Sequence, residues 1–338
     1  MNSAFAEVAL PLPIDHPFTY GIPPRLGVPL RVGHRVKVPF RARELSGFVV
    51  DFPKHPPPME IRDIKSIAEP EPLLDEKLLE LGRWVADTWL CSWGQALDAM
   101  VPAGVKRATV RRTIAVARAA ATPPGAAPKT EAQRRIFDAL VRAGEPVVVS
   151  SLLDRVKATR GPLTSLVKAG YVEITRQVPD TDAMDLDVDP GAQDLALTPD
   201  QEQALRTIRA AVGAAPRGVL LHGVTGSGKT EVYLRAIADV VAAGRQAIVL
   251  VPEIALTPQT VARFRARFPR LAVLHSVLAE SDRARAWRSI RAGEIDVVVG
   301  ARSAVFAPVR SLGLIVLDEE HEHAYKQEGD PRYHARDV

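Results

Sequence analysis

The hydrophobic pattern of the last part of the chain predicts strands that alternate with helices. Five short apolar runs have the length of buried strands, and they lie at residues 219–222, 247–251, 271–275, 296–299 and 314–317. Between most of these runs apolar residues recur at helical spacing, as they do over 230–243 before Gly244. Because alternating strands and helices form parallel sheets covered on both faces, residues 195–338 are predicted to be a doubly wound α/β domain.

The first part of the chain has a different pattern, with many prolines and short strand signals. Basic and apolar residues alternate from Arg35 through Lys37, which predicts a strand with one solvated, cationic face, and 47–50 is its expected partner. Apolar residues at helical spacing then predict a helix over 75–90. Residues 1–105 are therefore predicted to form a small, mostly β domain.

Residues 130–178 are predicted to form a compact helical domain. Apolar residues at helical spacing indicate one helix, a second short helix over 151–156 and a third that carries Lys168. A strand is predicted at 171–175. Three helices with a strand at the edge predict a winged helix, a module that binds DNA or protein. Lys168 is the only basic residue of the expected recognition helix, which argues against strong reading of a DNA groove.

Composition predicts two linkers, at 106–129 and 179–194. The first is rich in proline and includes a basic run without acids, formed by Lys106, Arg107, Arg111, Arg112 and Arg118. This run has two interpretations, contact with phosphates and a solvated linker, and the sequence favours neither. The second linker is acidic. The formal charge of the whole chain, +4 at pH 7, hints at a polyanionic partner.

Composition also excludes several classes of protein. A hydrophobic content of 46% and a charged content of 25% are those of a soluble globular protein. Cys91 is the only cysteine, which excludes a disulfide framework and a cysteine zinc site within these residues. No apolar run approaches the roughly 20 residues of a membrane helix, and residues 1–13 lack the pattern of a secretory signal. We therefore expect a cytoplasmic protein with no membrane segment.

The segment GVTGSGKT at 223–230 matches the P-loop pattern G-x-x-x-x-G-K-[ST]. It stands between an expected strand and an expected helix, where glycines let backbone N–H groups converge on phosphate oxygens. The predicted nucleotide-binding residues here are Gly223, Val224, Thr225, Gly226, Ser227, Gly228, Lys229 and Thr230. Lys229 is expected to reach the β- and γ-phosphates, and Thr230 to ligate Mg²⁺. The alternative, a glycine-rich turn that binds nothing, is disfavoured by the number of matched positions.

A second phosphate-site motif follows the last apolar run, where DEEH occupies 318–321. Asp318, at the carboxyl edge of the sheet, is predicted to hold Mg²⁺ with Thr230, and Glu319 to orient and deprotonate the attacking water. The alternative interpretation is an acidic strand end that meets solvent. The predicted catalytic residues are thus Lys229, Asp318 and Glu319.

Two further loops follow predicted strands, at 252–259 and 300–308. Loops at the carboxyl ends of parallel strands are where such sheets bind ligands. The side chains suited to phosphate oxygens of a single strand are Thr257, Gln259, Arg302 and Ser303. Ordinary turn chemistry is the alternative reading of the same residues.

Together these segments resemble the PriA family of replication-restart helicases. The matching segments are GVTGSGKTEVY at 223–233, VPEIALTPQ at 251–259, GARSAVFAP at 300–308, DEEH at 318–321, YKQ at 325–327 and RYHARD at 332–337. Near the start, VALPLP at 8–13, FTY at 18–20 and RVKVPF at 35–40 resemble the family's 3′-DNA-end-binding domain. The resemblance covers the whole chain.

The resemblance implies an ATP-dependent 3′-to-5′ DNA helicase of superfamily 2, with a RecA-like lobe at 195–338, that recognises stalled forks and initiates primosome assembly. It implies ATP and Mg²⁺ as cofactors and a nucleoid-associated monomer in the cytoplasm. The implied partners are forked and single-stranded DNA with a 3′ end, primosome and helicase-loading proteins, and single-stranded DNA-binding protein. DNA contacts are implied for Arg35 and Lys37, and for an aromatic-rich loop in which bases stack, with Tyr325, Lys326, Tyr333 and His334.

Gln201 has two interpretations. Thr198, Pro199 and Gln201 form the pattern of a capping box at a helix start. Helicases of the resembled class also place a glutamine here to recognise adenine. Because a glutamine amide has two ends, both interpretations can hold together, and both stay open.

The chain departs from the family at three places. Thr19 stands where the family often has an acid that helps to hold the terminal base, and Ala301 stands where threonine is usual. The sequence also stops at Val338, before the expected second lobe and the family's zinc cysteines. The alternative function is therefore an ATP-binding scaffold that recognises forks without effective helicase activity. A small-molecule kinase is disfavoured, because it would not account for the winged helix or the two loops.

Overall fold

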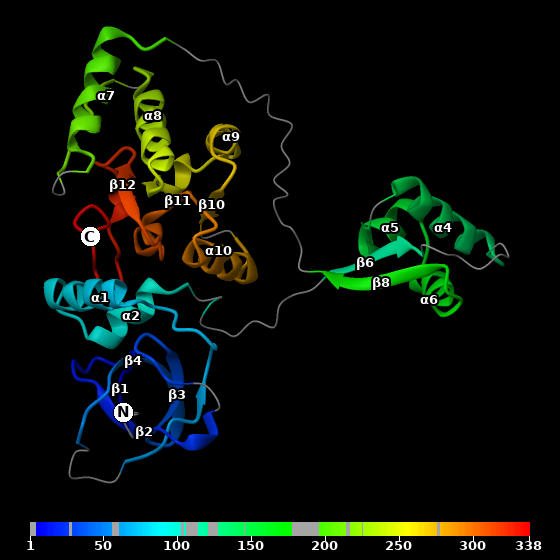
Figure 1. Cartoon of the computed structure of the whole chain (residues 1–338), viewed down its shortest axis with the longest axis horizontal. Helices are drawn as coiled ribbons and strands as arrows, with labels where there is room; N and C mark the ends of the chain where they lie inside the picture. Colours follow the sequence, from blue (N-terminus) through cyan, green and yellow to red (C-terminus); the bar gives the residue numbers. More distant parts are fainter. Residues whose placement is uncertain are drawn as a thin grey trace. The chain divides into compact units, whose positions relative to one another are not determined.

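The computed structural model describes residues 5–26, 29–55, 61–102, 105, 114–120, 128–144, 146–177, 196–213, 217–224, 226–275 and 278–338. It divides into two compact units, and each is described by itself. The first comprises Met1–Ala108 together with Leu186–Val338, and the second comprises Thr109–Asp185. Figure 1 shows both units, coloured along the chain.

The first unit begins with an antiparallel sheet in the order β2-β1-β4-β3-β5. Its strands are β1 (Phe5–Ala9), β2 (Phe18–Gly21), β3 (Arg35–Phe40), β4 (Arg43–Asp51) and β5 (Ser66–Ile67), and the short 3₁₀ helix η1 (Pro24–Leu26) follows β2. The pairing of β3 with β4 confirms the strand and the partner that the alternating residues predicted. One side of the sheet carries an apolar cluster that includes Val8, Val36, Val38 and Val49.

The predicted cationic face of β3 is wrong for Arg35. Lys37 is exposed, but Arg35 is only 3% exposed, and its Nε lies 3.9 Å from Oε2 of Glu69. Burial lowers the pKa of Arg35 and raises that of Glu69. Alternation along a strand shows which residues share a face, but it does not show where another segment covers that face. Arg35 therefore does not present its charge to DNA.

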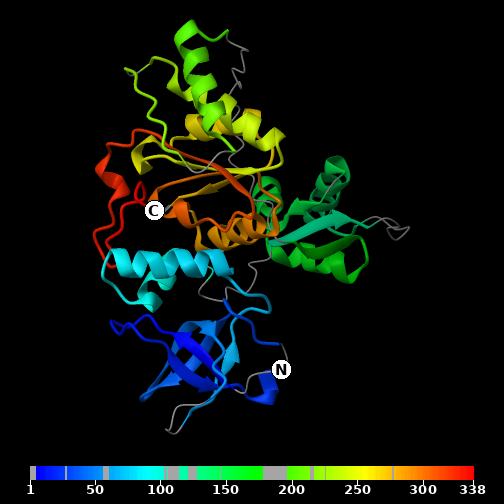
Figure 2. The same ribbon diagram turned by 60° about the vertical axis from the view of Figure 1, so that its left-hand side comes forward.

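Two helices connect this sheet to the rest of the unit. They are α1 (Glu76–Thr88), which begins at the N-cap Asp75, and α2 (Trp93–Met100), which begins with a capping box at Ser92. The first confirms the helix predicted over 75–90. Figures 1 and 2 show both helices lying between the antiparallel sheet and the parallel sheet. A single apolar cluster joins residues of these helices to both sheets.

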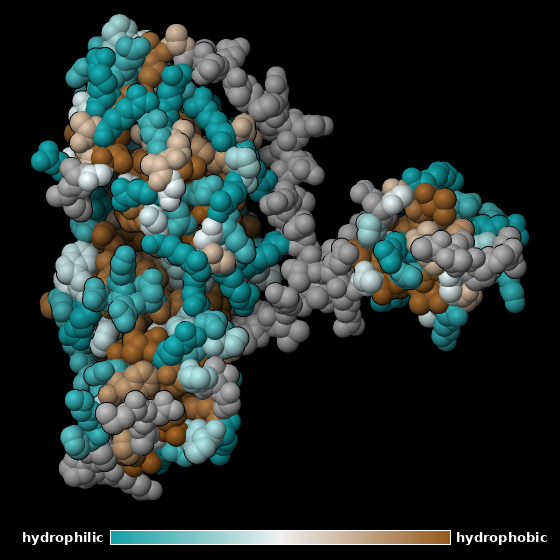
Figure 3. Space-filling model, viewed as in Figure 1, coloured by the Kyte–Doolittle hydropathy of each residue, from teal (hydrophilic) through white to brown (hydrophobic). Residues whose placement is uncertain are grey.

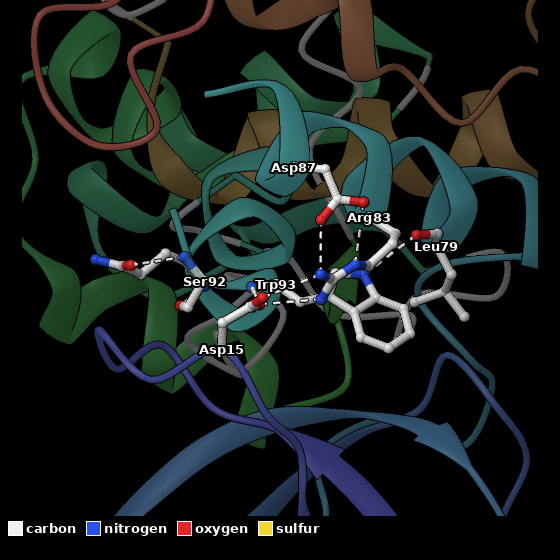
Figure 4. A network of polar contacts seen from close by, with 7 residues as sticks. Asp15, Leu79, Arg83, Asp87, Ser92 and Trp93 are labelled. Carbon is white, nitrogen blue, oxygen red and sulfur yellow. Dashed lines mark hydrogen bonds and ion pairs between the residues drawn. The ribbon is translucent and has the colours of Figure 1, made fainter. Parts of the chain in front are cut away.

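An ion-pair network fixes this helix pair to the loop after β1. Figure 4 shows the Arg83 guanidinium between the carboxylates of Asp15 and Asp87. Two Arg83 nitrogens donate to the two Asp15 oxygens at 3.0 Å each, and Nη2 also donates to Asp87 at 2.6 Å. The backbone N–H of Trp93 donates to the same Asp15, and its indole Nε1 donates to the carbonyl of Leu79. The network ties α1, α2 and the loop together.

A four-stranded parallel sheet in the order β10-β11-β9-β12 forms the rest of the first unit. Its strands are β9 (Gln246–Leu250), β10 (Leu271–Leu274), β11 (Val297–Gly300) and β12 (Leu312–Leu317). The helices of this part are α7 (Pro199–Ala211), α8 (Lys229–Ala242), α9 (Pro258–Arg267) and α10 (Glu280–Ala292), with 3₁₀ helices η2 (Glu253–Ala255), η3 (Arg302–Phe306) and η4 (His323–Tyr325). Figure 3, in the view of Figure 1, shows hydrophilic residues over α7 and α8.

Alternate residues of β9 show that helices cover both faces of this sheet. Ala247 and Val249 belong to the apolar cluster that includes α8 and α9, whereas Ile248 and Leu250 belong to the cluster that includes α10. All five residues of β9 are buried, as expected for a central parallel strand. The doubly wound parallel sheet predicted from the sequence is therefore confirmed.

One predicted strand is wrong. Residues 219–222 form no strand in the structure, and Leu220 is 75% exposed and Val219 42%. Among the strands that the structure describes, β12 pairs with β9 alone and lies at the edge of the sheet. An apolar run predicts burial, but a strand also needs a neighbour for its N–H and C=O groups, and the sequence does not show one. The P-loop is thus reached through an exposed segment.

The second unit combines three helices with a three-stranded antiparallel sheet in the order β7-β6-β8. Its elements are β6 (Ile114–Ala119), α4 (Glu131–Ala143), β7 (Val147–Val148), α5 (Val149–Val156), α6 (Arg160–Lys168) and β8 (Val172–Gln177). The three predicted helices and the strand after them are confirmed. Their buried apolar side chains, among them Ile136, Leu140, Leu163 and Leu166, form one cluster.

The predicted linker at 106–129 is wrong in part, because it contains β6. This strand pairs with β8 from Ile114 opposite Gln177 to Ala119 opposite Val172. The pairing is distant in sequence, so composition alone could not reveal it. Arg118 of the basic run pairs with Glu173 in this sheet. The other four basic residues of the run, and the acidic linker at 179–194, lie outside the described residues. Within the described part of the chain, no helix has the length and hydrophobicity needed to cross a membrane.

Candidate functional site

The P-loop segment turns directly into α8. Gly226 and Gly228 both have φ of 80°, a left-handed conformation that favours glycine, and Gly228 is the N-cap of the helix. No side chain caps this helix start, and an uncapped helix N-terminus is suited to an anion. Thr225 lies outside the described residues. The local geometry is thus suited to phosphate oxygens.

Lys229 extends over the same loop. Its Nζ donates to the carbonyl oxygens of Gly223 at 2.7 Å and Val224 at 3.1 Å. These bonds hold the ammonium group at the mouth of the turn, where phosphate oxygens could replace the carbonyls as its acceptors.

Gln201 uses both ends of its side-chain amide. Oε1 accepts a hydrogen bond from the backbone N–H of Thr198, and the Thr198 hydroxyl accepts one from the N–H of Gln201, which completes the predicted capping box. Nε2 donates to the carbonyl of Ser227 at 2.9 Å. The capping interpretation is confirmed, and the other end of the amide contacts the P-loop. Recognition of adenine stays a prediction.

Asp318 lies at the carboxyl end of β12, next to the start of α8. Its backbone N–H donates to the carbonyl of Leu250 at 2.9 Å, and its Oδ2 accepts a hydrogen bond from the phenol of Tyr233 at 3.2 Å. Thr230 precedes this tyrosine by three residues on α8. Burial raises the pKa of Asp318, while the Tyr233 hydrogen bond and the charge of Lys229 act against that shift. The structure therefore places Asp318 beside the helix that begins with Lys229 and Thr230.

Glu319 adopts an unusual backbone conformation directly after Asp318. Its φ is 47°, in the left-handed region that residues other than glycine rarely occupy. Its carboxylate is 40% exposed and lies 3.8 Å from Nδ1 of His321. Glu320 pairs instead with Arg336 at 3.1 Å. Among the ion pairs of the described residues, Glu319 has no arginine partner, and its catalytic role stays a prediction.

The residues present fit a magnesium nucleotide. A hydroxyl at 230 and a carboxylate at 318 are hard oxygen donors of the kind that Mg²⁺ prefers. The free helix start and the Lys229 ammonium supply the positive field that a triphosphate needs. The sequence did not reveal one neighbour of this site, Tyr233, because its ring suits the apolar face of α8 and no pattern shows which group its hydroxyl contacts.

The two tyrosines predicted to stack on bases are buried in this structure. Tyr325 is 0% exposed and Tyr333 2%. The hydroxyl of Tyr325 contacts the carbonyl oxygens of Leu250 and Asp318, and the ring of Tyr333 packs against Phe306 with centroids 4.9 Å apart. An aromatic ring carries a large apolar area, and the sequence does not show whether a base or the protein core covers it. In this structure the core covers both rings.

The other predicted DNA contacts divide into anchored and exposed residues. Thr257 is the N-cap of α9, so its side chain has an ordinary capping role. Arg302 donates from Nη1 to the carbonyl of Lys326 at 2.7 Å, which fixes the loop after DEEH. His334 is partly buried and pairs with Lys326 in an isolated bridge. The exposed members of the predicted set are Lys37, Gln259, Ser303 and Lys326.

Thr19, where the chain departs from the family pattern, has an acidic neighbour. It lies opposite Glu7 in the pairing of β1 with β2, and its hydroxyl donates to Oε1 of Glu7 at 3.4 Å. A carboxylate is therefore present beside this position, although it comes from the adjacent strand.

Two family models match the chain. A model described as a 3′ DNA-binding domain matches residues 7–102, and a model described as a DEAD/DEAH box helicase matches residues 198–337. The first match covers the antiparallel sheet with α1 and α2, and the second covers the parallel sheet with the P-loop and Asp318.

Curated relatives match nearly the whole chain. Replication restart protein PriA of Bacillus subtilis (strain 168) is 34% identical over 99% of this chain and 51% of the relative. The proteins of the same name from Chlamydia pneumoniae and Treponema pallidum (strain Nichols) are 34% and 35% identical, over 99% and 98% of this chain and 46% and 41% of the relatives. The chain belongs to the PriA family of replication restart proteins, and it spans about half the length of the curated relatives it matches.

Proposed function

We propose that this chain is part of an ATP-dependent 3′-to-5′ DNA helicase that recognises stalled replication forks and initiates primosome assembly in the cytoplasm. The observation that carries the proposal is that Asp318, at the end of β12, is hydrogen-bonded to Tyr233 of α8, the helix that begins with Lys229 and Thr230 of the P-loop. Relatives named as replication restart proteins support the same function.

The chain's own residues have distinct roles in this proposal. Lys229 and the first turn of α8 would bind the triphosphate, and Thr230 and Asp318 would hold Mg²⁺, whose charge would offset the negative charge of the transferring phosphate. Glu319 accepts a proton from the attacking water. The match to a 3′ DNA-binding domain supports recognition of a free 3′ end by residues 1–105.

We further propose that residues 130–178 act as a winged helix. Three helices and a three-stranded antiparallel sheet support that comparison. Primosome proteins, helicase-loading proteins and single-stranded DNA-binding protein are the partners that this function requires of a monomeric fork-recognition enzyme.

Titration calorimetry with ATP and Mg²⁺ tests the nucleotide site. Lys229→Ala removes a charge-assisted contact to phosphate, so affinity should fall by about 10- to 100-fold, the equivalent of roughly 1.5–3 kcal/mol. Lys77→Ala is the matched control, because Lys77 is an exposed lysine of α1. Equal affinities for wild type and Lys229→Ala would refute the proposed site.

Binding of single-stranded DNA tests the proposed end recognition. We expect a strand with a free 3′-hydroxyl to bind more tightly than the same strand with a 3′-phosphate, and affinity to fall with salt at a slope of about −0.7 per phosphate contacted. Indifference to the 3′-phosphate would remove the assignment of 3′-end binding to residues 1–105.

A further inference from the structure

The phenol of Tyr233 contacts one of the two residues assigned to magnesium and lies one helical turn from the other. Its Oη donates to Oδ2 of Asp318 at 3.2 Å. Thr230 and Tyr233 are three residues apart on α8, so their side chains adjoin on one face of the helix. The P-loop pattern ends at 230, and it does not require a hydroxyl at 233.

We propose that Tyr233 is a positioning residue for the magnesium site, whose hydroxyl holds one carboxylate oxygen of Asp318 and so limits the orientations in which that carboxylate would bind the metal. This inference rests on the proposed nucleotide site. A carboxylate on a single bond to its chain can rotate, and a donor fixed on one oxygen removes that freedom.

The surroundings of Tyr233 make it a rigid donor. The side chain is 6% exposed, and its ring stacks on the fully buried Phe264 with centroids 6.3 Å apart and an interplanar angle of 18°. The ring therefore cannot follow a moving carboxylate. A buried hydroxyl needs a hydrogen-bond partner, and the carboxylate of Asp318 is that partner.

The backbone of Asp318 is held independently of Tyr233. Its N–H donates to the carbonyl of Leu250, and its carbonyl accepts from the phenol of Tyr325 at 2.6 Å. The carboxylate itself accepts a hydrogen bond from Tyr233. Loss of the Tyr233 hydroxyl should therefore change the side chain of Asp318 and leave its backbone in place.

The test separates binding of nucleotide from binding of metal. Calorimetry with this chain measures ATP affinity first in EDTA and then across a titration of Mg²⁺. Tyr233→Phe, which keeps the ring, should bind ATP in EDTA as the wild type does. The Mg²⁺ concentration that gives half of the metal-dependent gain in affinity should rise by about 10-fold or more, as for loss of other groups that orient metal ligands.

Two further variants distinguish the hydroxyl from packing. Tyr233→Met also lacks the hydroxyl and should show the same rise. Phe264→Leu keeps the hydroxyl and loses only the ring stacking, so its Mg²⁺ midpoint should rise less than that of Tyr233→Phe even as its melting temperature falls. In an Asp318→Asn background, Tyr233→Phe should have no further effect.

An unchanged Mg²⁺ midpoint in Tyr233→Phe would overturn the inference, and so would an equal rise in Phe264→Leu. Wild-type protein that binds no ATP in either condition would instead refute the nucleotide site on which the inference rests. Failure of the Tyr233 inference can therefore be distinguished from failure of the proposed nucleotide site.

Discussion

Gln201 offers a sharp test of how α7 supports the P-loop, because Thr198 supplies a matched control. Both residues form the capping box, but only Gln201 also donates to the carbonyl of Ser227, at 2.9 Å. Loss of an N-cap side chain costs about 0.5–2 kcal/mol. Thr198→Ala and Gln201→Ala should therefore both lower the melting temperature, by about 2–4 °C for each kcal/mol lost.

The two variants should differ in nucleotide affinity. The bond from Gln201 to Ser227 joins neutral, exposed groups, so it contributes about 1 kcal/mol, and its loss should weaken ATP binding about 5-fold. Thr198→Ala should leave ATP affinity unchanged. Calorimetry with ATP and with GTP measures the affinity of each variant for both nucleotides. If Gln201 recognises adenine, Gln201→Ala should also show a smaller preference for ATP over GTP than the wild type does. Equal ATP affinities for the two variants would refute a role for the Ser227 contact.

Two further predictions concern the first sheet and its helices. Removing one member of a buried ion pair leaves an uncompensated charge, so Arg35→Met should lower the free energy of unfolding by about 3–5 kcal/mol, and the double change with Glu69→Leu should recover most of it in denaturant titrations. A double variant no more stable than Arg35→Met would contradict this reasoning. The hydrogen bond from Arg83 lowers the pKa of Asp15 below its ordinary value of 3.8, so this contact stabilises the fold above that pH and is lost as pH falls below it. The stability difference between wild type and Arg83→Gln should therefore shrink below about pH 4, and a difference independent of pH between 3 and 6 would count against the assignment.

Local patterns were sufficient for much of the fold and of the nucleotide site. The period of apolar residues identified the helix at 75–90, the helices of the second unit and four strands of the parallel sheet, because these elements are rich in apolar side chains at regular spacing. The P-loop could be recognised because it needs glycine at particular left-handed positions, such as 226 and 228. Asp318 could be predicted because an acid directly after an apolar strand lies where that strand ends.

Tertiary structure decided what depends on distant neighbours. The run at 219–222 has the composition of a strand but no described strand pairs with it, whereas β6 exists because Val172–Gln177 pairs with it. The same holds for side chains, since Arg35 and Tyr325 are buried by segments that lie elsewhere in the sequence. The phenol of Tyr233 belongs to the site because Oδ2 of Asp318, at the end of β12, lies 3.2 Å from it, and the sequence does not show this contact. Sequence by itself determines the local conformation and the chemical groups present, and packing determines which of those groups meet, because burial and hydrogen bonding are satisfied by neighbours in space.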